Sequence, residues 1–196
     1  ASEVAGNLIT GPATGINPMM DISYPNIHHN TIIVTGTDTC IGFYFGSTNS
    51  NPVTYATVRD NICQSAGDNF DVTVNSWGSR SGYTIDYNRY TSSANYRGDQ
   101  YGSGDTTYTD LATWRTATGK EANSSEVSSP VCSWLDTTDY KITAATACKT
   151  ASSSGGEVGA YGIASCVGSA CSADSPIVVN SSSVVRGVSA KGAKLK

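Results

Sequence analysis

The feature that most constrains the fold is an asparagine that recurs before short apolar or extended stretches. It stands in four segments, Gly6–Ile9, His29–Ile32, Asp60–Cys63 and Tyr87–Tyr90. The asparagines are 23, 31 and 27 residues apart, a spacing that suits one turn of a β-solenoid of roughly two dozen residues with insertions between strands. We therefore expect an all-β chain built as a parallel β-helix of about four coils.

The four asparagines are predicted to form a structural ladder of hydrogen bonds: Asn7, Asn30, Asn61 and Asn88. A buried asparagine at a tight turn tolerates a left-handed backbone conformation. Its amide can bond to the asparagines of the coils above and below, which pairs polar groups that burial would otherwise leave unsatisfied. The alternative is that these are unrelated turn residues in an Asn-rich protein.

Short β-branched or aromatic segments flank these turns and are bounded by Gly, Asn, Ser or Pro. They are Thr31–Thr35, Ile41–Phe45, Thr54–Val58, Phe70–Val74 and Tyr83–Tyr87. A β-sandwich would show the same local signals, and the asparagine repeat favours the solenoid.

One segment has a helical pattern, residues 110–119, with Thr109 or Asp110 as its N-cap and Gly119 as its stop. Its apolar residues, Trp114 among them, share one face. A short helix with an inward tryptophan suits a cap, because the last coil of a solenoid otherwise exposes unpaired strand edges.

Composition and charge limit the partners. The 196 residues carry a net charge of −4 with 14% charged residues, and no basic stripe marks a nucleic-acid interface. No apolar run approaches the ~18 residues of a membrane span. We expect neither a nucleic-acid partner nor a membrane span.

The six cysteines favour disulfides and an oxidising compartment, so we expect a secreted, extracellular or cell-surface protein. The sequence does not fix the pairing. Our expected pairs are Cys40 with Cys63, Cys132 with Cys148, and Cys166 with Cys171.

Two parts are expected, a β-helix domain over residues 1–164 and a Cys-containing tail over residues 165–196 with a strand at Pro176–Asn180 and a basic end. The first coil would present an open edge, either because the chain is a piece of a longer solenoid or because it needs a partner. The tail strand is expected to pair with that edge in another copy or in a β-helix partner.

Several segments occur in an order that resembles the C-terminal part of bacterial secreted right-handed parallel β-helix proteins of the pectate-lyase-like superfamily. They are Asp86–Tyr90, Asp110–Ser124, Asp139–Ile142 and Val158–Tyr161. The resemblance covers residues 20–162 and departs from the family at Glu121, where Asp is usual. It implies a right-handed coil, and it is more specific for fold than for function, because the family includes polysaccharide lyases, epimerases and surface proteins.

A lyase or epimerase of this class would need a base near a sugar C5 proton and a cation to neutralise the uronate. Arg59 and Arg89 flank the asparagine turns and could project from one side of adjacent coils, although a solvated face is the simpler interpretation. The pair His28 and His29 could bind a metal or act as a base, but turn filling is commoner. No catalytic residue is assigned.

Two further sets of residues are candidates for binding. Asp68 and Asp71 place oxygens in a turn that could hold Ca²⁺, although a plain turn is the simpler interpretation and no other cofactor is expected. Tyrosines gather between residues 83 and 108, and Tyr96 and Tyr101 are the expected sugar contacts.

These patterns favour a non-catalytic extracellular or cell-surface β-helix protein that acts in structure, assembly or interaction. Its expected partners are other copies of itself, a β-helix partner or a polysaccharide. The alternatives are the C-terminal part of a polysaccharide lyase or epimerase and a carbohydrate-binding module.

Overall fold

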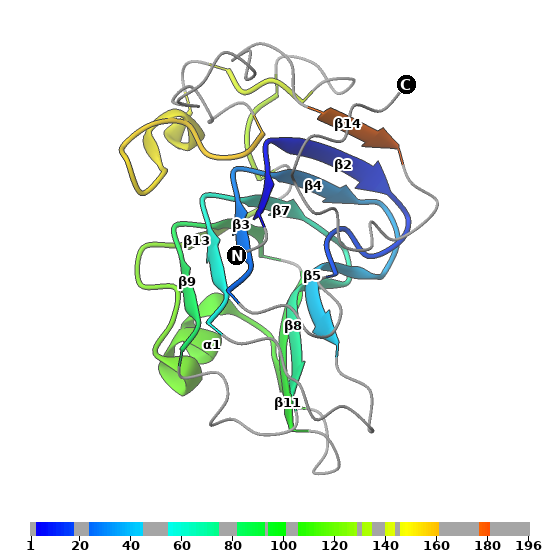
Figure 1. Ribbon diagram of the computed structural model, residues 1–196, viewed down its shortest axis with the longest axis vertical. Helices are drawn as coiled ribbons and strands as arrows, with labels where there is room; N and C mark the ends of the chain where they lie inside the picture. Colours follow the sequence, from blue (N-terminus) through cyan, green and yellow to red (C-terminus); the bar gives the residue numbers. More distant parts are fainter. Residues whose placement is uncertain are drawn as a thin grey trace.

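The computed structural model describes residues 3–17, 24–44, 55–74, 82–92, 94–100, 106–128, 131–134, 140–143, 146–160 and 177–180. The regular structure of these residues consists mostly of strands in parallel sheets, and one α-helix accompanies them (Figure 1). This arrangement is compatible with the expected all-β class and with a β-helix. Tyr101, Cys166 and Cys171 lie outside the described residues.

The strands form three sheets. The first contains β1 (Glu3–Ala5), β3 (Asn26–His28), β6 (Thr57–Arg59) and β9 (Thr84–Asp86). The second contains β13 (Ser125–Val127), β10 (Arg89–Thr91), β7 (Ile62–Gln64), β4 (Thr31–Val34), β2 (Asn7–Gly11) and β14 (Ile177–Asn180). The third contains β12 (Thr107–Tyr108), β11 (Asn95–Gln100), β8 (Asp68–Val74) and β5 (Thr39–Tyr44).

The chain passes through the three sheets in a repeated order, from β3 to β4 to β5, then β6 to β7 to β8, then β9 to β10 to β11. All these strands pair in parallel with the equivalent strand of the next passage, and β12 alone pairs antiparallel among the described strands. The register places apolar residues of successive strands beside one another, as Ile27 beside Val58 and Val58 beside Ile85. Each such residue is buried, so the sheets enclose one core.

Helix α1 (Leu111–Thr118) covers one end of this core. Asp110 is its N-cap and accepts a hydrogen bond from the Thr113 amide, and Gly119 ends it at a φ of 68°. Trp114, only 1% exposed, stacks on Tyr96 with ring centroids 5.9 Å apart. The sequence-based expectation for this helix is confirmed, because both caps lie where their residue types predict.

A second, smaller core lies against the second sheet. Val131, Cys132, Cys148 and Val158 pack with Ile62 of β7. The approach is close: a Cβ atom at residue 159 would lie 2.5 Å from Ile62 Cδ1. Gly159, at a φ of 82°, is therefore required where the chain crosses β7.

The strand of the tail, β14, pairs in parallel with β2 of its own chain, with Ile177 opposite Asn7 and Asn180 opposite Thr10 (Figure 1). We expected this strand to pair with another copy or a β-helix partner; within the single chain it pairs with β2. The edge of β2 offers unpaired backbone groups, and a strand on the same chain reaches it without the entropy cost of association.

The position of β14 predicts the behaviour of a shortened chain. A chain that ends at residue 160 lacks β14 and leaves the edge of β2 unpaired, so we expect concentration-dependent self-association in sedimentation velocity. A chain that ends at residue 180 keeps β14 and is the matched control, expected to sediment like the full chain. Equal behaviour of both truncated chains would contradict the protective role of β14.

Candidate functional site

The four asparagines form a continuous ladder at the turn between the first and second sheets. Asn7 donates from its backbone N and its Nδ2 to Asn30 Oδ1, at 3.1 and 2.8 Å. Asn30 donates likewise to Asn61 Oδ1, at 3.0 Å for both bonds. Asn61 donates to Asn88 Oδ1 at 3.0 and 3.1 Å. Every rung donates in the same direction, so the amide dipoles add along the ladder.

The ladder ends on a buried carboxyl group. Asn88 donates its backbone N to Ser124 Oγ at 2.8 Å and its Nδ2 to Glu121 Oε2 at 3.3 Å. Ser124 and Tyr90 donate their hydroxyl groups to the same carboxyl group. Arg115 of α1 holds this segment through the carbonyl oxygens of Glu121 and Ser124, at 2.8 and 3.0 Å. The cap helix therefore positions the last acceptor of the ladder.

Burial raises the pKa of Glu121 to about 7, although hydrogen bonds from Ser124, Tyr90 and Asn88 favour the carboxylate. The desolvation cost exceeds the gain from three donors because the side chain is only 1% exposed. In the sequence, Glu121 stands out only as a departure from a family pattern. No sequence signal distinguishes a buried glutamate from a solvated one in a loop.

The left-handed backbone of each turn lies one residue earlier than expected. The residues with positive φ are Gly6, His29, Asp60 and Tyr87, at 69°, 51°, 59° and 59°. Each precedes a ladder asparagine, and the expectation that the asparagine itself would be left-handed is wrong for these turns. The asparagine needs a backbone that aims its N–H and its side chain at the same acceptor in the next coil.

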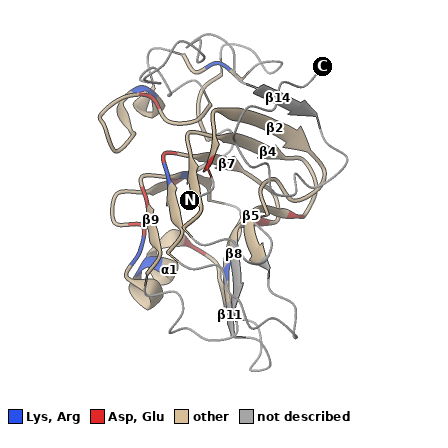
Figure 2. Ribbon diagram, viewed as in Figure 1, with Lys and Arg blue, Asp and Glu red and all other residues tan. Residues whose placement is uncertain are grey.

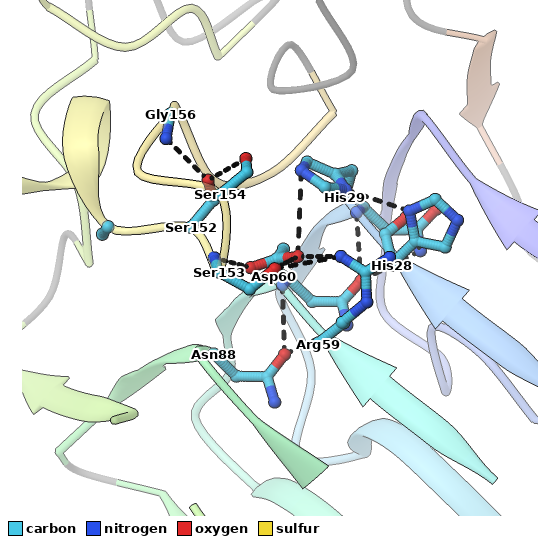
Figure 3. Close-up of polar contacts among 12 residues, drawn as sticks. His28, His29, Arg59, Asp60, Asn88, Ser152, Ser153, Ser154 and Gly156 are labelled. Carbon is cyan, nitrogen blue, oxygen red and sulfur yellow. Dashed lines mark hydrogen bonds and ion pairs between the residues drawn. The ribbon is translucent and has the colours of Figure 1, made fainter. Parts of the chain in front are cut away.

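A polar cluster surrounds Asp60 at the same turns (Figure 3). Its carboxylate is fully buried, pairs with Arg59 and accepts bonds from Ser153 N and Oγ at 2.5 and 2.7 Å. Arg59 also donates to Ser153 Oγ at 3.1 Å. The cluster thus fastens the loop around Ser153 to the turn between β6 and β7.

The two histidines connect this cluster to the first coil. His28 Nε2 lies 2.6 Å from Glu3 Oε1, the two Nδ1 atoms of His28 and His29 lie 2.9 Å apart, and His29 Nε2 lies 3.9 Å from Asp60 Oδ2. Burial lowers the pKa of His29 to about 4, against the opposing effect of Asp60 and with smaller lowering effects of His28 and Arg59. His29 is therefore neutral near pH 7 and fills the turn as a hydrogen-bonding group.

The other candidate residues are mostly engaged in the fold. Asp68 Oδ2 lies 3.0 Å from Arg97 Nε, and the side chain of Asp71 lies outside the described part. Arg89 donates to the carbonyl oxygens of Asn88 and Asn123, both at 3.2 Å. Within the described ranges, no group of three or more His, Cys, Asp or Glu side chains could hold a metal ion.

The expected sugar contact at Tyr96 is wrong. Tyr96 is 0% exposed, and its ring lies 5.3 Å from that of Tyr90 and 5.9 Å from that of Trp114. A sugar could reach it only if the core opened. The residue belongs to β11 and faces inward, so the tyrosines that gather between residues 83 and 108 do not share one exposed surface.

Two disulfides join residues that the sequence analysis had paired. Cys40–Cys63 joins β5 to β7, with Cα atoms 5.8 Å apart. Cys132–Cys148 closes the smaller core, with Cα atoms 6.1 Å apart. The first lies among fully buried residues of the main core, so it links successive coils from within.

Comparison with known proteins gives no match: no family model matches the chain, and no curated protein or solved structure is similar to it. The resemblance to pectate-lyase-like proteins therefore rests on the quoted segments and on the parallel sheets. In the part of the chain that the structure describes, no helix is long and apolar enough to cross a membrane.

The ladder predicts a graded loss of stability. Asn61→Ala removes the acceptor of both Asn30 donors, so we expect the free energy of unfolding to fall by about 3 kcal/mol or more. Asn7→Ala keeps a backbone donor for Asn30 and removes no acceptor of another rung, so we expect about 1 kcal/mol. Urea unfolding monitored by circular dichroism gives both values, and equal losses would contradict a directional ladder.

Glu121 and His29 predict opposite dependences of stability on pH. The pKa of Glu121 is raised in the folded state, so its contribution is present below about pH 4.5 and is lost as pH rises through 7. The pKa of His29 is lowered, so its contribution is present above about pH 6.5 and is lost as pH falls through 4. Each group changes the free energy of unfolding by about 3 kcal/mol at full extent. The two changes have opposite signs between about pH 4 and pH 7.

Two variants separate these effects. Glu121→Gln retains an acceptor without the titration, so we expect its stability to decrease as pH falls from 6.5 to 4. His29→Asn suits the left-handed turn, and we expect its stability to decrease as pH rises from 4.5 to 7. Urea unfolding across this range measures both slopes relative to the unmodified chain. Parallel curves for the two variants would rule out the assigned roles.

Proposed function

We propose that the chain is a non-catalytic extracellular or cell-surface protein with a right-handed parallel β-helix of about four coils, which acts in structure, assembly or interaction. The observation that carries this proposal is the use of the chemically capable side chains around Asp60. Arg59, Asp60 and Ser153 bond to one another, and they hold a loop to the coil. A catalytic reaction would need the guanidinium, carboxylate and hydroxyl groups of these residues to contact a substrate, and here they bond to one another.

The cations elsewhere support the same role. A lyase-type reaction would need a cation directed at a uronate, yet several candidates are engaged in contacts within the fold. These contacts are Arg97 with Asp68, Arg115 with the Glu121 carbonyl, Lys120 with the Tyr83 carbonyl, and Lys149 with Glu157. Figure 2 shows charged positions of both signs distributed over several elements.

Two physical arguments support the right-handed coil and the number of coils. Connections between parallel strands of one sheet are right-handed in about 98% of cases, which favours a right-handed coil for the passage from β3 through β4 and β5 to β6. Strand β2 begins at a ladder asparagine and β4, β7 and β10 each begin directly after one, which supports about four coils. The two disulfides fit an oxidising compartment and hence secretion.

Among the proposed roles, interaction has the best support. Strand β14 already occupies the edge of β2 that end-to-end assembly through this sheet would use. A stable outer surface on a rigid coil suits recognition of another molecule.

The proposal is tested by an assay for lyase chemistry. The full chain is incubated with polygalacturonate or alginate, with and without Ca²⁺, and the ultraviolet absorbance of unsaturated uronates is followed. We expect no product above a buffer control. Product formed by the unmodified chain and abolished in Arg59→Ala, with the fold retained by circular dichroism, would overturn the non-catalytic role.

A further inference from the structure

Two exposed tyrosines occupy equivalent positions in successive coils. Asn26 of β3 pairs with Thr57 of β6, and Thr57 pairs with Thr84 of β9. The residues two positions earlier are Tyr24, Tyr55 and Gly82, so they form one row along the stacking direction of the coils. This row lies at the start of the first sheet's strands, apart from the turn that holds the asparagine ladder.

The two tyrosine rings are stacked face to face. Their centroids are 4.9 Å apart and their planes differ by 9°. Despite this contact, Tyr24 is 55% exposed and Tyr55 is 53% exposed. The lower end of the stack is closed by Gly82, where a Cβ atom would lie 2.5 Å from Tyr55 Cδ1. Tyr24 keeps more than half of its surface open although Tyr55 covers one face, so the opposite face carries much of that exposure.

The backbone at these positions does not favour tyrosine. Tyr24 and Tyr55 have φ angles of 59° and 54°, a left-handed conformation that is uncommon for a bulky residue. Glycine adopts it freely. Gly82, at the third position of the row, is not among the residues with positive φ. The rings are half-exposed, so burial offsets little of this cost. Two aromatic residues kept at a position that suits glycine point to a use outside the fold's own stability.

The neighbouring row supplies neutral hydrogen-bonding groups. Asn26, Thr57 and Thr84 stand on the outward side of the first sheet, because the residues that follow them, such as Ile27 and Val58, are buried in the core. The Asn26 side chain is only partly exposed, and its Oδ1 atom is buried without a hydrogen-bond partner among the described atoms. Glu3 continues this row in the first coil and bonds to His28.

We propose that the Tyr24–Tyr55 stack and the adjacent Asn26 and Thr57 side chains bind a polysaccharide, with one sugar ring on the open face of Tyr24. An apolar ring face beside neutral amide and hydroxyl groups matches a sugar, which presents C–H groups on its faces and hydroxyl groups at its edges. A proline-rich peptide needs grooves lined by aromatic rings, whereas these two rings stack directly on each other. This site rests on the proposed interaction role and names the class of molecule that is bound.

Affinity gel electrophoresis tests the site with the full chain. The probes are hydroxyethyl cellulose, xylan, galactomannan and polygalacturonate, each cast into a native gel. We expect at least one of them to retard the chain, and we expect Tyr24→Gly to weaken that retardation at least tenfold in apparent Kd. Tyr24→Phe keeps the ring face and should retain binding. Tyr87→Gly changes another left-handed tyrosine (φ 59°) at the ladder turn and should bind like the unmodified chain.

Thermal unfolding separates binding from folding, because glycine suits the left-handed backbone and Tyr24→Gly should unfold at the temperature of the unmodified chain or above it. The proposal is overturned if none of the four polysaccharides retards the chain, or if Tyr24→Gly and the unmodified chain bind equally. Binding of a polyproline peptide, lost in Tyr24→Gly, in place of the polysaccharides would also overturn it.

Discussion

The structure depends on one interaction, the pairing of buried amide groups at the turn between the first and second sheets. A tight turn repeated inside a stack of coils buries backbone N–H groups that the sheets themselves cannot pair. Each ladder asparagine after Asn7 supplies one oxygen that accepts both the backbone and side-chain N–H of the asparagine before it, as Asn61 does for Asn30. A single residue type thereby satisfies the turn and sets the register of the strands on both sides.

The ladder also explains why one end of the stacked sheets carries an additional helix and a buried carboxyl group. Its last rung needs an acceptor that is not another asparagine, and Glu121 provides one from the segment that follows α1. Arg115 fixes that segment, while Trp114 of the same helix closes the aromatic core. The cap is thus one unit that covers apolar rings and terminates a polar chain. The buried carboxyl group of Glu121 and the buried imidazole of His29 change the stability with pH in opposite directions. The pH dependence due to either group is therefore seen only when the other group is replaced.

Much of the architecture could be predicted from local signals. The asparagine spacing indicates the turns, and the caps at Asp110 and Gly119 delimit the helix, because these features depend on residue type and short-range geometry. The site was less predictable. The burial of Tyr96 was missed because the pairing of β11 with β8 shifts register between Asn95 and Tyr96, and such an irregularity leaves no clean alternation in the sequence. The contact between Tyr24 and Tyr55 depends on the register of β3 against β6, which no short window of sequence contains.

The likeness of the rungs has a consequence for how such a chain can change length. Because each rung presents the same donors and accepts in the same way, a whole coil is a repeatable unit, and an in-frame duplication between Asn61 and Asn88 would find its partners on both sides. The same duplication between Cys40 and Cys63 would separate the two sulfur atoms of the internal disulfide. A duplication placed after Asn88 would separate the Asn88 side chain from its acceptor, Glu121. Insertion of a coil is therefore disfavoured between Cys40 and Cys63, where a covalent bond joins neighbouring coils, and after Asn88, where the ladder meets its last acceptor.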